Sequence, residues 1–139
     1  MKTVLILCTG NSARSIMAEY LVNTELGDQW QAYSAGVEPS KVNPYAVTAM
    51  AELGISLDGA RSKSVDEFLE RDDLDLVITV CDHARETCPV FMKPVPQEHV
   101  GFEDPAPYSD KGDDVALAKF REVRDRIRNE LIPFLRERA

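Results

Sequence analysis

The sequence lacks any long apolar run. The run at its start, residues 4–8, is about five residues long, whereas the apolar core of a secretory signal has roughly 7–15. No other stretch approaches the roughly 18 apolar residues that a membrane-spanning helix needs. These absences predict a protein that works in the cytoplasm and has no membrane partner.

Positive charge is also scarce. The chain has 16 lysines and arginines against 24 aspartates and glutamates, which gives a formal net charge of -8. Such an excess of negative charge argues against nucleic acid or an anionic membrane as the main partner. An anionic ligand would therefore need a locally positive pocket.

Cysteine occurs only three times. An odd number of thiols in a reducing compartment does not predict a structural disulfide framework. A chain of 139 residues, with 44% hydrophobic and 29% charged residues, is instead long enough and apolar enough to form a globular core without cross-links. We therefore expect a single domain over residues 1–139.

Apolar runs alternate with amphipathic stretches along the chain. Strands are predicted at residues 4–7, 30–35, 74–80 and 95–102. Helices are predicted at residues 16–26, 43–53, 64–69 and 113–134. This alternation predicts an α/β fold with a parallel sheet covered on both faces. Ligands of such sheets bind beyond the carboxyl ends of the strands, where Cys8 and Cys81 lie.

The segment between the first strand and the first helix is a candidate anion site. Residues 9–13 make the connection, and Gly10 and Asn11 can adopt left-handed backbone angles. Such a turn directs successive N–H groups inward and adds the positive end of the helix dipole, which suits a tetrahedral anion.

Arg14 and Cys8 fit this interpretation. An arginine at a helix N-terminus is repelled by the dipole, but its planar guanidinium can hold two oxygens of a bound oxyanion. The same positive field favours the thiolate form of Cys8, to which Ser15 could add a hydrogen bond. A cysteine followed six residues later by Arg-Ser, across a strand-to-helix boundary, is more specific than an isolated buried cysteine.

These residues resemble a known superfamily. The octapeptide CTGNSARS at 8–15 and EDP at 103–105 are similar to the low-molecular-weight tyrosine phosphatases. Cys81 and Cys88 narrow the resemblance to the thioredoxin-coupled arsenate reductases. The resemblance extends through YSAG at residues 33–36, NP at 43–44, CPV at 88–90 and EHVGFEDPA at 98–106. Position 13 departs from the pattern, because Ala13 stands where these families often have another cysteine.

The resemblance implies a three-layer α/β/α fold with a central four-stranded parallel sheet. It implies arsenate as substrate, with phosphate or sulfate able to occupy the same loop, thioredoxin as reductant, and no cofactor. The catalytic residues that it implies are Cys8, Cys81, Cys88, Arg14 and Asp104. The oxyanion-binding residues that it implies are Thr9, Gly10, Asn11, Ser12, Ala13, Arg14 and Ser15.

The number of thiols distinguishes the two activities within this superfamily. A phosphatase needs only Cys8, Arg14 and an acid. Reduction of arsenate also needs a second thiol to attack the Cys8 sulfur and a third to carry the disulfide outward, and Cys81 and Cys88 suit these roles. The alternatives are a tyrosine phosphatase and a thiol or oxyanion sensor without turnover. A zinc site from the three cysteines and His99 lacks the short paired spacing of structural sites.

The acid and the neighbouring polar residues follow from the same resemblance. Asp104 matches the general acid, and Glu103 is the weaker candidate. His83 and His99 are expected at the surface or behind the site rather than as catalysts.

Some relatives bind a monovalent cation near the loop. Asn11, Glu19 and Ser34 match positions involved there, but Lys63 replaces a further acidic ligand, and its ammonium group could take the cation's place. No metal site is predicted.

Overall fold

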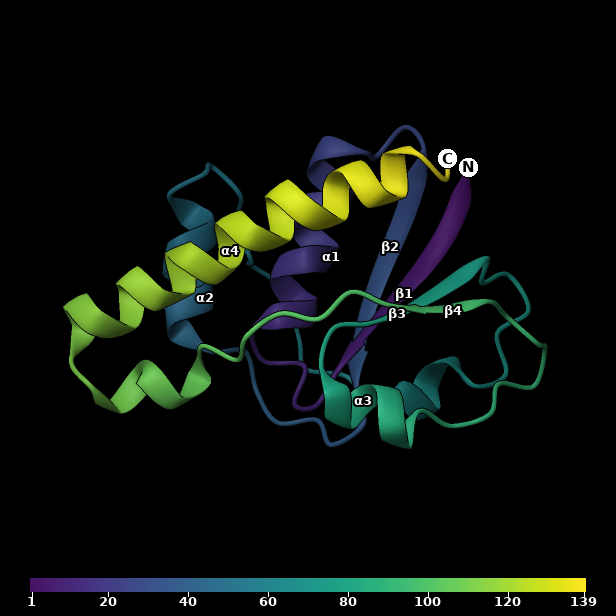
Figure 1. The fold of residues 1–139 in the computed structure, drawn as a ribbon, viewed down its shortest axis with the longest axis horizontal. Helices are drawn as coiled ribbons and strands as arrows, with labels where there is room; N and C mark the ends of the chain where they lie inside the picture. Colours follow the sequence, from purple (N-terminus) through teal and green to yellow (C-terminus); the bar gives the residue numbers. More distant parts are fainter.

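The computed structural model describes residues 1–139 as one parallel sheet with helices packed against it (Figure 1). The strand order is β2-β1-β3-β4. The strands are β1 (Lys2–Cys8), β2 (Trp30–Gly36), β3 (Leu76–Thr79) and β4 (Gln97–His99). All four predicted strands are present, and the predicted α/β architecture is confirmed. β4 is shorter than predicted at both ends; at its start, Pro96 has no N–H to donate to the ladder.

Three helices lie together on one side of the sheet, and the shorter helical segments lie near the carboxyl ends of the strands (Figure 1). The three are α1 (Arg14–Glu25), α2 (Pro44–Ala51) and α4 (Asp113–Arg136). The shorter ones are η1 (Val65–Phe68), α3 (Asp82–Thr87) and η2 (Ala106–Asp110). The patterns did not predict α3 or η2. No helix combines the length and apolar character required to cross a bilayer.

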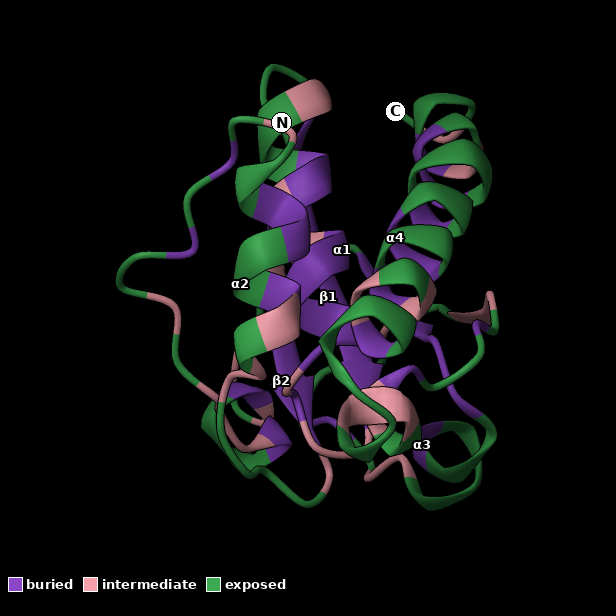
Figure 2. Cartoon of the chain, turned by 90° about the vertical axis from the view of Figure 1, so that its left-hand side faces the viewer, coloured by how far each residue is buried: buried purple, intermediate pink, exposed green.

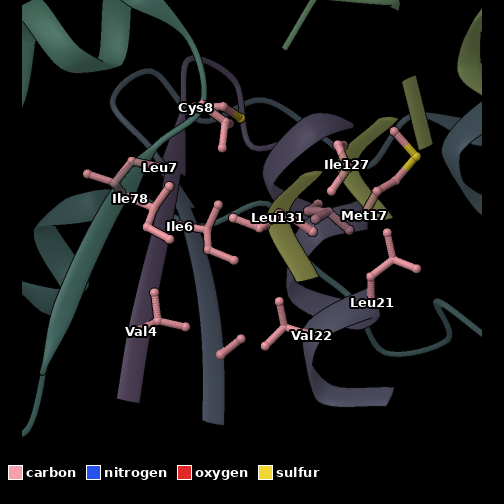
Figure 3. Close-up of a cluster of buried hydrophobic side chains, with 14 of the residues drawn as sticks. Val4, Ile6, Leu7, Cys8, Met17, Leu21, Val22, Ile78, Ile127 and Leu131 are labelled. Atoms are coloured by element: carbon pink, nitrogen blue, oxygen red, sulfur yellow. The ribbon is translucent and has the colours of Figure 1, made fainter. Parts of the chain in front are cut away.

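The core forms on both faces of β1. Val4, Leu5, Ile6 and Leu7 are all 0% exposed, so consecutive side chains that point to opposite faces are equally covered. On one face, Val4 and Ile6 lie toward α1 and α4 (Figure 3). The helix residues labelled there are Met17, Leu21, Val22, Ile127 and Leu131. The outer face of α4 is exposed while its inner face is buried (Figure 2), as an amphipathic helix on a sheet requires.

The starts of two helical segments show how local sequence fixes the elements. The Asn43 side chain accepts a hydrogen bond from the Tyr45 N–H at 2.9 Å, and Pro44 occupies the first turn of α2. Ser64 caps η1 by accepting from the Asp66 N–H at 3.1 Å. The Glu67 carboxylate, three residues after Ser64, does not reach back to the cap but pairs with Arg61.

The sheet topology places the site. The chain passes from β1 to β2 on one side of β1, and later to β3 on the other side, so strand order reverses at β1. Cys8 ends β1, and Cys81 follows β3. Both termini lie at the opposite end of the sheet (Figure 1), away from this crevice.

Candidate active site

Cys8 is a buried thiol at the end of β1, surrounded by hydrogen-bond donors. Its side chain is 2% exposed. The Asn11 N–H donates to the sulfur at 3.2 Å, and the Ser15 hydroxyl lies 2.9 Å from it. A thiolate can only accept, so both groups stabilise the charged form. The predicted contact of Ser15 with the sulfur is confirmed.

Asn11 holds the loop in shape. It is fully buried and is the only non-glycine residue with positive φ, at 47°. Its side-chain amide donates to Ser15 Oγ at 2.7 Å and to Ser34 Oγ at 3.0 Å, while its oxygen accepts from the Lys63 N–H at 2.8 Å. The sequence allowed a left-handed residue at Gly10 or Asn11, and the structure uses Asn11, whose amide satisfies its neighbours.

Next to Asn11 and Ser34 lies a charged pair, Glu19 and Lys63. Ser34 donates to the Glu19 carboxylate, and Lys63 Nζ lies 3.6 Å from it. Burial raises the pKa of Glu19, and this effect is opposed by the bond from Ser34 and the charge of Lys63. The four residues matched to a cation site are thus together, with the Lys63 ammonium beside the carboxylate.

Arg14 is the first residue of α1, and it is 9% exposed. Its Nη1 donates to the Phe102 carbonyl at 3.2 Å, and its Nη2 lies 3.6 Å from Asp104 Oδ2. No side chain caps α1 at Ala13, so the first N–H groups of the helix are left for another acceptor. These contacts aim the guanidinium across the mouth of the loop.

A small cavity lies between the loop and Asp104. Its volume is about 200 Å³, and its lining residues are Cys8, Thr9, Gly10, Ser12, Ala13, Arg14 and Asp104. The structure therefore brings together most of the predicted oxyanion residues, and it places Asn11 and Ser15 behind the cavity wall. The thiol, the guanidinium and a carboxylate that share one space have the parts needed for nucleophilic attack on an oxyanion.

The structure separates the two candidate acids. Asp104 lines the cavity, and its Oδ1 is oriented by the Ala106 N–H at 3.0 Å. Glu103 instead accepts from Lys119 at 3.1 Å and from Tyr108 at 3.4 Å, which turns it toward α4. Only Asp104 is placed to protonate a group leaving from the cavity.

The other two cysteines lie at the two ends of α3. Cys81 is buried, and its sulfur lies 3.3 Å from Thr9 Oγ1 and accepts from the Ala84 N–H at 3.4 Å. Cys88 is partly exposed, and its thiol points to the Pro89 carbonyl at 3.7 Å. Burial raises the pKa of the Cys88 thiol above its ordinary value. Cys81 therefore contacts the Cys8 loop, whereas Cys88 lies at the far end of a helix.

Two features of the site have no signal in the sequence. The Phe102 carbonyl that holds Arg14 is a main-chain group, which any residue could supply. Helix α3 has a single buried residue, Ala84, so it has no apolar periodicity.

The fold and the loop together define an α/β protein with a cysteine and an arginine in the turn between its first strand and first helix. Residues 3–138 match the model of the low molecular weight phosphotyrosine protein phosphatase family, and the chain belongs to this family.

Similar proteins are named as arsenate reductases or as tyrosine phosphatases. An arsenate reductase of Halalkalibacterium halodurans is 44% identical over 133 residues, which cover 96% of this chain and 94% of the relative. An arsenate reductase of Bacillus subtilis is 43% identical over 133 residues, which cover 96% of this chain and 94% of the relative. Among solved structures, an arsenate reductase in the oxidized state has a TM-score of 0.82 at 30% identity over 100% of both chains. A low molecular weight protein tyrosine phosphatase from T. tengcongensis has a TM-score of 0.80 at 28% identity, also over 100% of both chains.

Proposed function

We propose that this protein is an arsenate reductase, in which Cys8, Cys81 and Cys88 act in turn and thioredoxin restores the thiols. The observation that carries the proposal is the position of Cys81, whose sulfur lies 3.3 Å from Thr9 of the Cys8 loop. A phosphatase does not need a second thiol there. The relatives that are at least 43% identical and bear the name arsenate reductase support the same activity.

The first step is nucleophilic attack. The Cys8 thiolate bonds to arsenic, Arg14 and the loop N–H groups bind the remaining oxygens, and one oxygen leaves as water after protonation by Asp104. Arsenic is still As(V) in this covalent adduct. Phosphate and sulfate have the same tetrahedral shape and are expected to compete for the loop.

Reduction occurs in the second step. Cys81 loses its proton and attacks the Cys8 sulfur, so a Cys8–Cys81 disulfide forms and the sulfur–arsenic bond breaks. The electron pair of that bond stays on arsenic, which leaves as arsenite, As(III). Two thiols have then supplied two electrons.

The third step moves the disulfide outward. Cys88 attacks Cys81, which frees Cys8 and leaves a Cys81–Cys88 bond that an external dithiol can reduce. Thioredoxin is the proposed donor, and arsenic detoxification is the proposed role. Such a cycle needs a reducing compartment, which fits three free cysteines and a cytoplasmic location.

Two other functions remain as outcomes of an experiment. A tyrosine phosphatase would use Cys8, Arg14 and Asp104 alone, and a sensor would bind an oxyanion without turnover. Purified protein should be mixed with arsenate, thioredoxin, thioredoxin reductase and NADPH. A reductase consumes NADPH in proportion to the arsenate added.

Cys81→Ser provides the matched control. This variant should lose arsenate-dependent NADPH consumption but keep any hydrolysis of an aryl phosphate, because hydrolysis does not use Cys81. Equal arsenate reduction by Cys81→Ser and the unmodified chain would contradict the relay. Hydrolysis without any arsenate reduction in the unmodified chain would identify a phosphatase.

A further inference from the structure

His99 contacts residues on both sides of Cys81. Its Nδ1 lies 2.8 Å from the hydroxyl of Thr79, two residues before the cysteine. Its Nε2 lies 3.3 Å from a carboxylate oxygen of Asp82, the residue after the cysteine. A single imidazole ring thus bridges the end of β3 and the start of α3.

The donors and acceptors of this bridge can all be paired in one tautomer of the ring. A carboxylate only accepts, so the hydrogen of a neutral imidazole belongs on Nε2, facing Asp82. Nδ1 is then free to accept from the Thr79 hydroxyl. Thr79 then donates to His99, and His99 donates to Asp82, so each polar group of the bridge has a partner.

His99 is held in position by the pairing of its strand, β4, with β3. Thr79 and His99 are paired residues in the β3–β4 ladder. The next residues continue the contact, since the Val100 N–H donates to Thr79 O and the Phe102 N–H donates to Val80 O, both at 3.0 Å. A Cβ at Gly101 would lie 2.9 Å from His99 Nε2, so glycine there leaves room for the ring.

We infer that His99 is a positioning residue for the attack of Cys81 on Cys8; this inference rests on the proposed function. The ring holds the turn from Thr79 to Asp82, so it sets where the Cys81 sulfur points. Asp82 is 76% exposed on its side chain, and a contact with so exposed a group contributes little to stability. The main effect of the bridge is therefore on the position of the Cys81 sulfur rather than on stability.

The attack is sensitive to this geometry. One sulfur must approach another in line with the bond that breaks, and a displacement of about 1 Å can cost roughly a hundredfold in rate. The anion site is held separately from the ring, because the Phe102 N–H donates to Val80 O at 3.0 Å and the Phe102 carbonyl accepts from Arg14 at 3.2 Å. A second cavity of about 300 Å³ lies between these parts, lined by Arg14, Cys81, Asp82, Gly101 and Phe102.

The test measures the attack itself. In a Cys88→Ser background, which stops the cycle after one turnover, the rate of Cys8–Cys81 bond formation is followed after mixing with saturating arsenate. His99→Ala should slow this step by roughly ten- to hundredfold, with little change in the arsenate concentration that gives half the maximal rate. A merely structural role would move that concentration as well.

Conservative variants show which contact matters. His99→Asn can keep the bond to Thr79, and His99→Gln can reach Asp82, so both should give rates between those of the parent and His99→Ala. The matched control is His83→Ala, because His83 follows Asp82 on α3 but faces Glu38 at 3.4 Å. His83→Ala should keep the parent rate.

Several results would overturn the inference. The first is a His99→Ala rate within about twofold of the parent rate. The second is an equal slowing in His83→Ala. The third is a change only in the arsenate concentration that gives half the maximal rate. If His99→Ala does not fold, Thr79→Val and Asp82→Ala each remove one end of the bridge, and parent rates in both would overturn the inference. A parent that forms no Cys8–Cys81 bond with arsenate instead refutes the proposed function.

Discussion

At the scale of the residue, Arg14 shows how an unfavourable position is tolerated. A cation at the N-terminus of a helix is repelled by the helix dipole, and from the sequence alone only a bound anion would offset this. The structure supplies two resident acceptors, the Phe102 carbonyl and the Asp104 carboxylate. Arg14 is therefore held in place before any anion arrives, which lowers the entropy cost of binding one.

Substitutions at Cys8 and Arg14 test the proposed chemistry. Cys8→Ser should abolish arsenate reduction, because a hydroxyl supplies neither the thiolate nor the electrons. Arg14→Lys should lower the steady-state rate by about 10²–10³, because an ammonium cannot bind two oxygens in one plane. Steady-state assays with thioredoxin measure both, and appreciable turnover by Cys8→Ser would exclude the mechanism.

The Cys88 thiol gives a prediction about pH. Burial disfavours its charged form, so its pKa lies above the ordinary value of about 8.5. The thiolate fraction, and with it the rate of alkylation by iodoacetamide, should keep rising with pH beyond that value. The measurement uses a Cys8→Ser/Cys81→Ser variant, in which Cys88 is the only thiol.

The same variant unfolded in urea serves as the control. Its alkylation should reach half of the maximum at a lower pH, because water then solvates the thiolate. A folded protein whose midpoint matches or falls below that of the unfolded chain would contradict the prediction.

The sequence predicts the residues of the loop better than their arrangement. Cys8 and Arg14 lie within one segment, so their proximity follows from a strand-to-helix turn. The choice of Asn11 over Gly10 for the left-handed position could not be predicted, because it depends on Ser34 and Lys63 from distant segments. The same holds for Thr9 and Cys81, which are 72 residues apart and meet only through the sheet.

At the scale of the element, α3 is the part whose conformation conflicts with the proposed cycle. Cys81 precedes its first residue and Cys88 follows its last. Seven helical steps at about 1.5 Å separate the two Cα atoms by roughly 10 Å. A disulfide requires about 4.4–6.8 Å, so the helix must unwind when the bond forms.

Hydrogen exchange should detect this unwinding. Amides of residues 82–88 should exchange faster in the Cys81–Cys88 disulfide form than in the reduced protein, whereas those of α1 should stay equally protected. Ala84 is the only buried residue of α3, so little apolar contact opposes the opening. Equal protection of 82–88 in both forms, with the disulfide confirmed by peptide mapping, would contradict the prediction.

The elements that the sequence predicts are those with a strong apolar pattern. β1 is a continuous apolar run, and α4 repeats its apolar positions over 24 residues. α3 and η2 are short and carry at most one buried residue, so periodicity gives no signal for them. In the structure α3 packs against β1 and β3, and η2 packs against α4.

At the scale of the whole molecule, the charge of the site opposes that of the chain. The net charge is -8, yet the cavity beside Cys8 holds Arg14 and the N-terminus of α1. No lysine lines that cavity, so its positive potential comes from one guanidinium and from main-chain N–H groups. A small oxyanion can enter the loop. A large anionic partner would also have to approach the acidic surface, so the site favours the small oxyanion.

The core between α1, α4 and the sheet stabilises the fold, and Leu131 of α4 tests this. Leu131 is fully buried within that layer. Leu131→Ala removes packed atoms and leaves a cavity, so the free energy of unfolding should fall by about 2–5 kcal/mol in urea titrations. Glu130→Ala is the matched control, because the neighbouring Glu130 pairs with exposed Arg126 at 3.0 Å and should cost no more than about 0.5 kcal/mol. Since Leu131 does not line the cavity beside Cys8, the rate per folded molecule of Leu131→Ala should remain that of the parent. A loss of stability no larger than that of Glu130→Ala would show that this layer does not carry the fold.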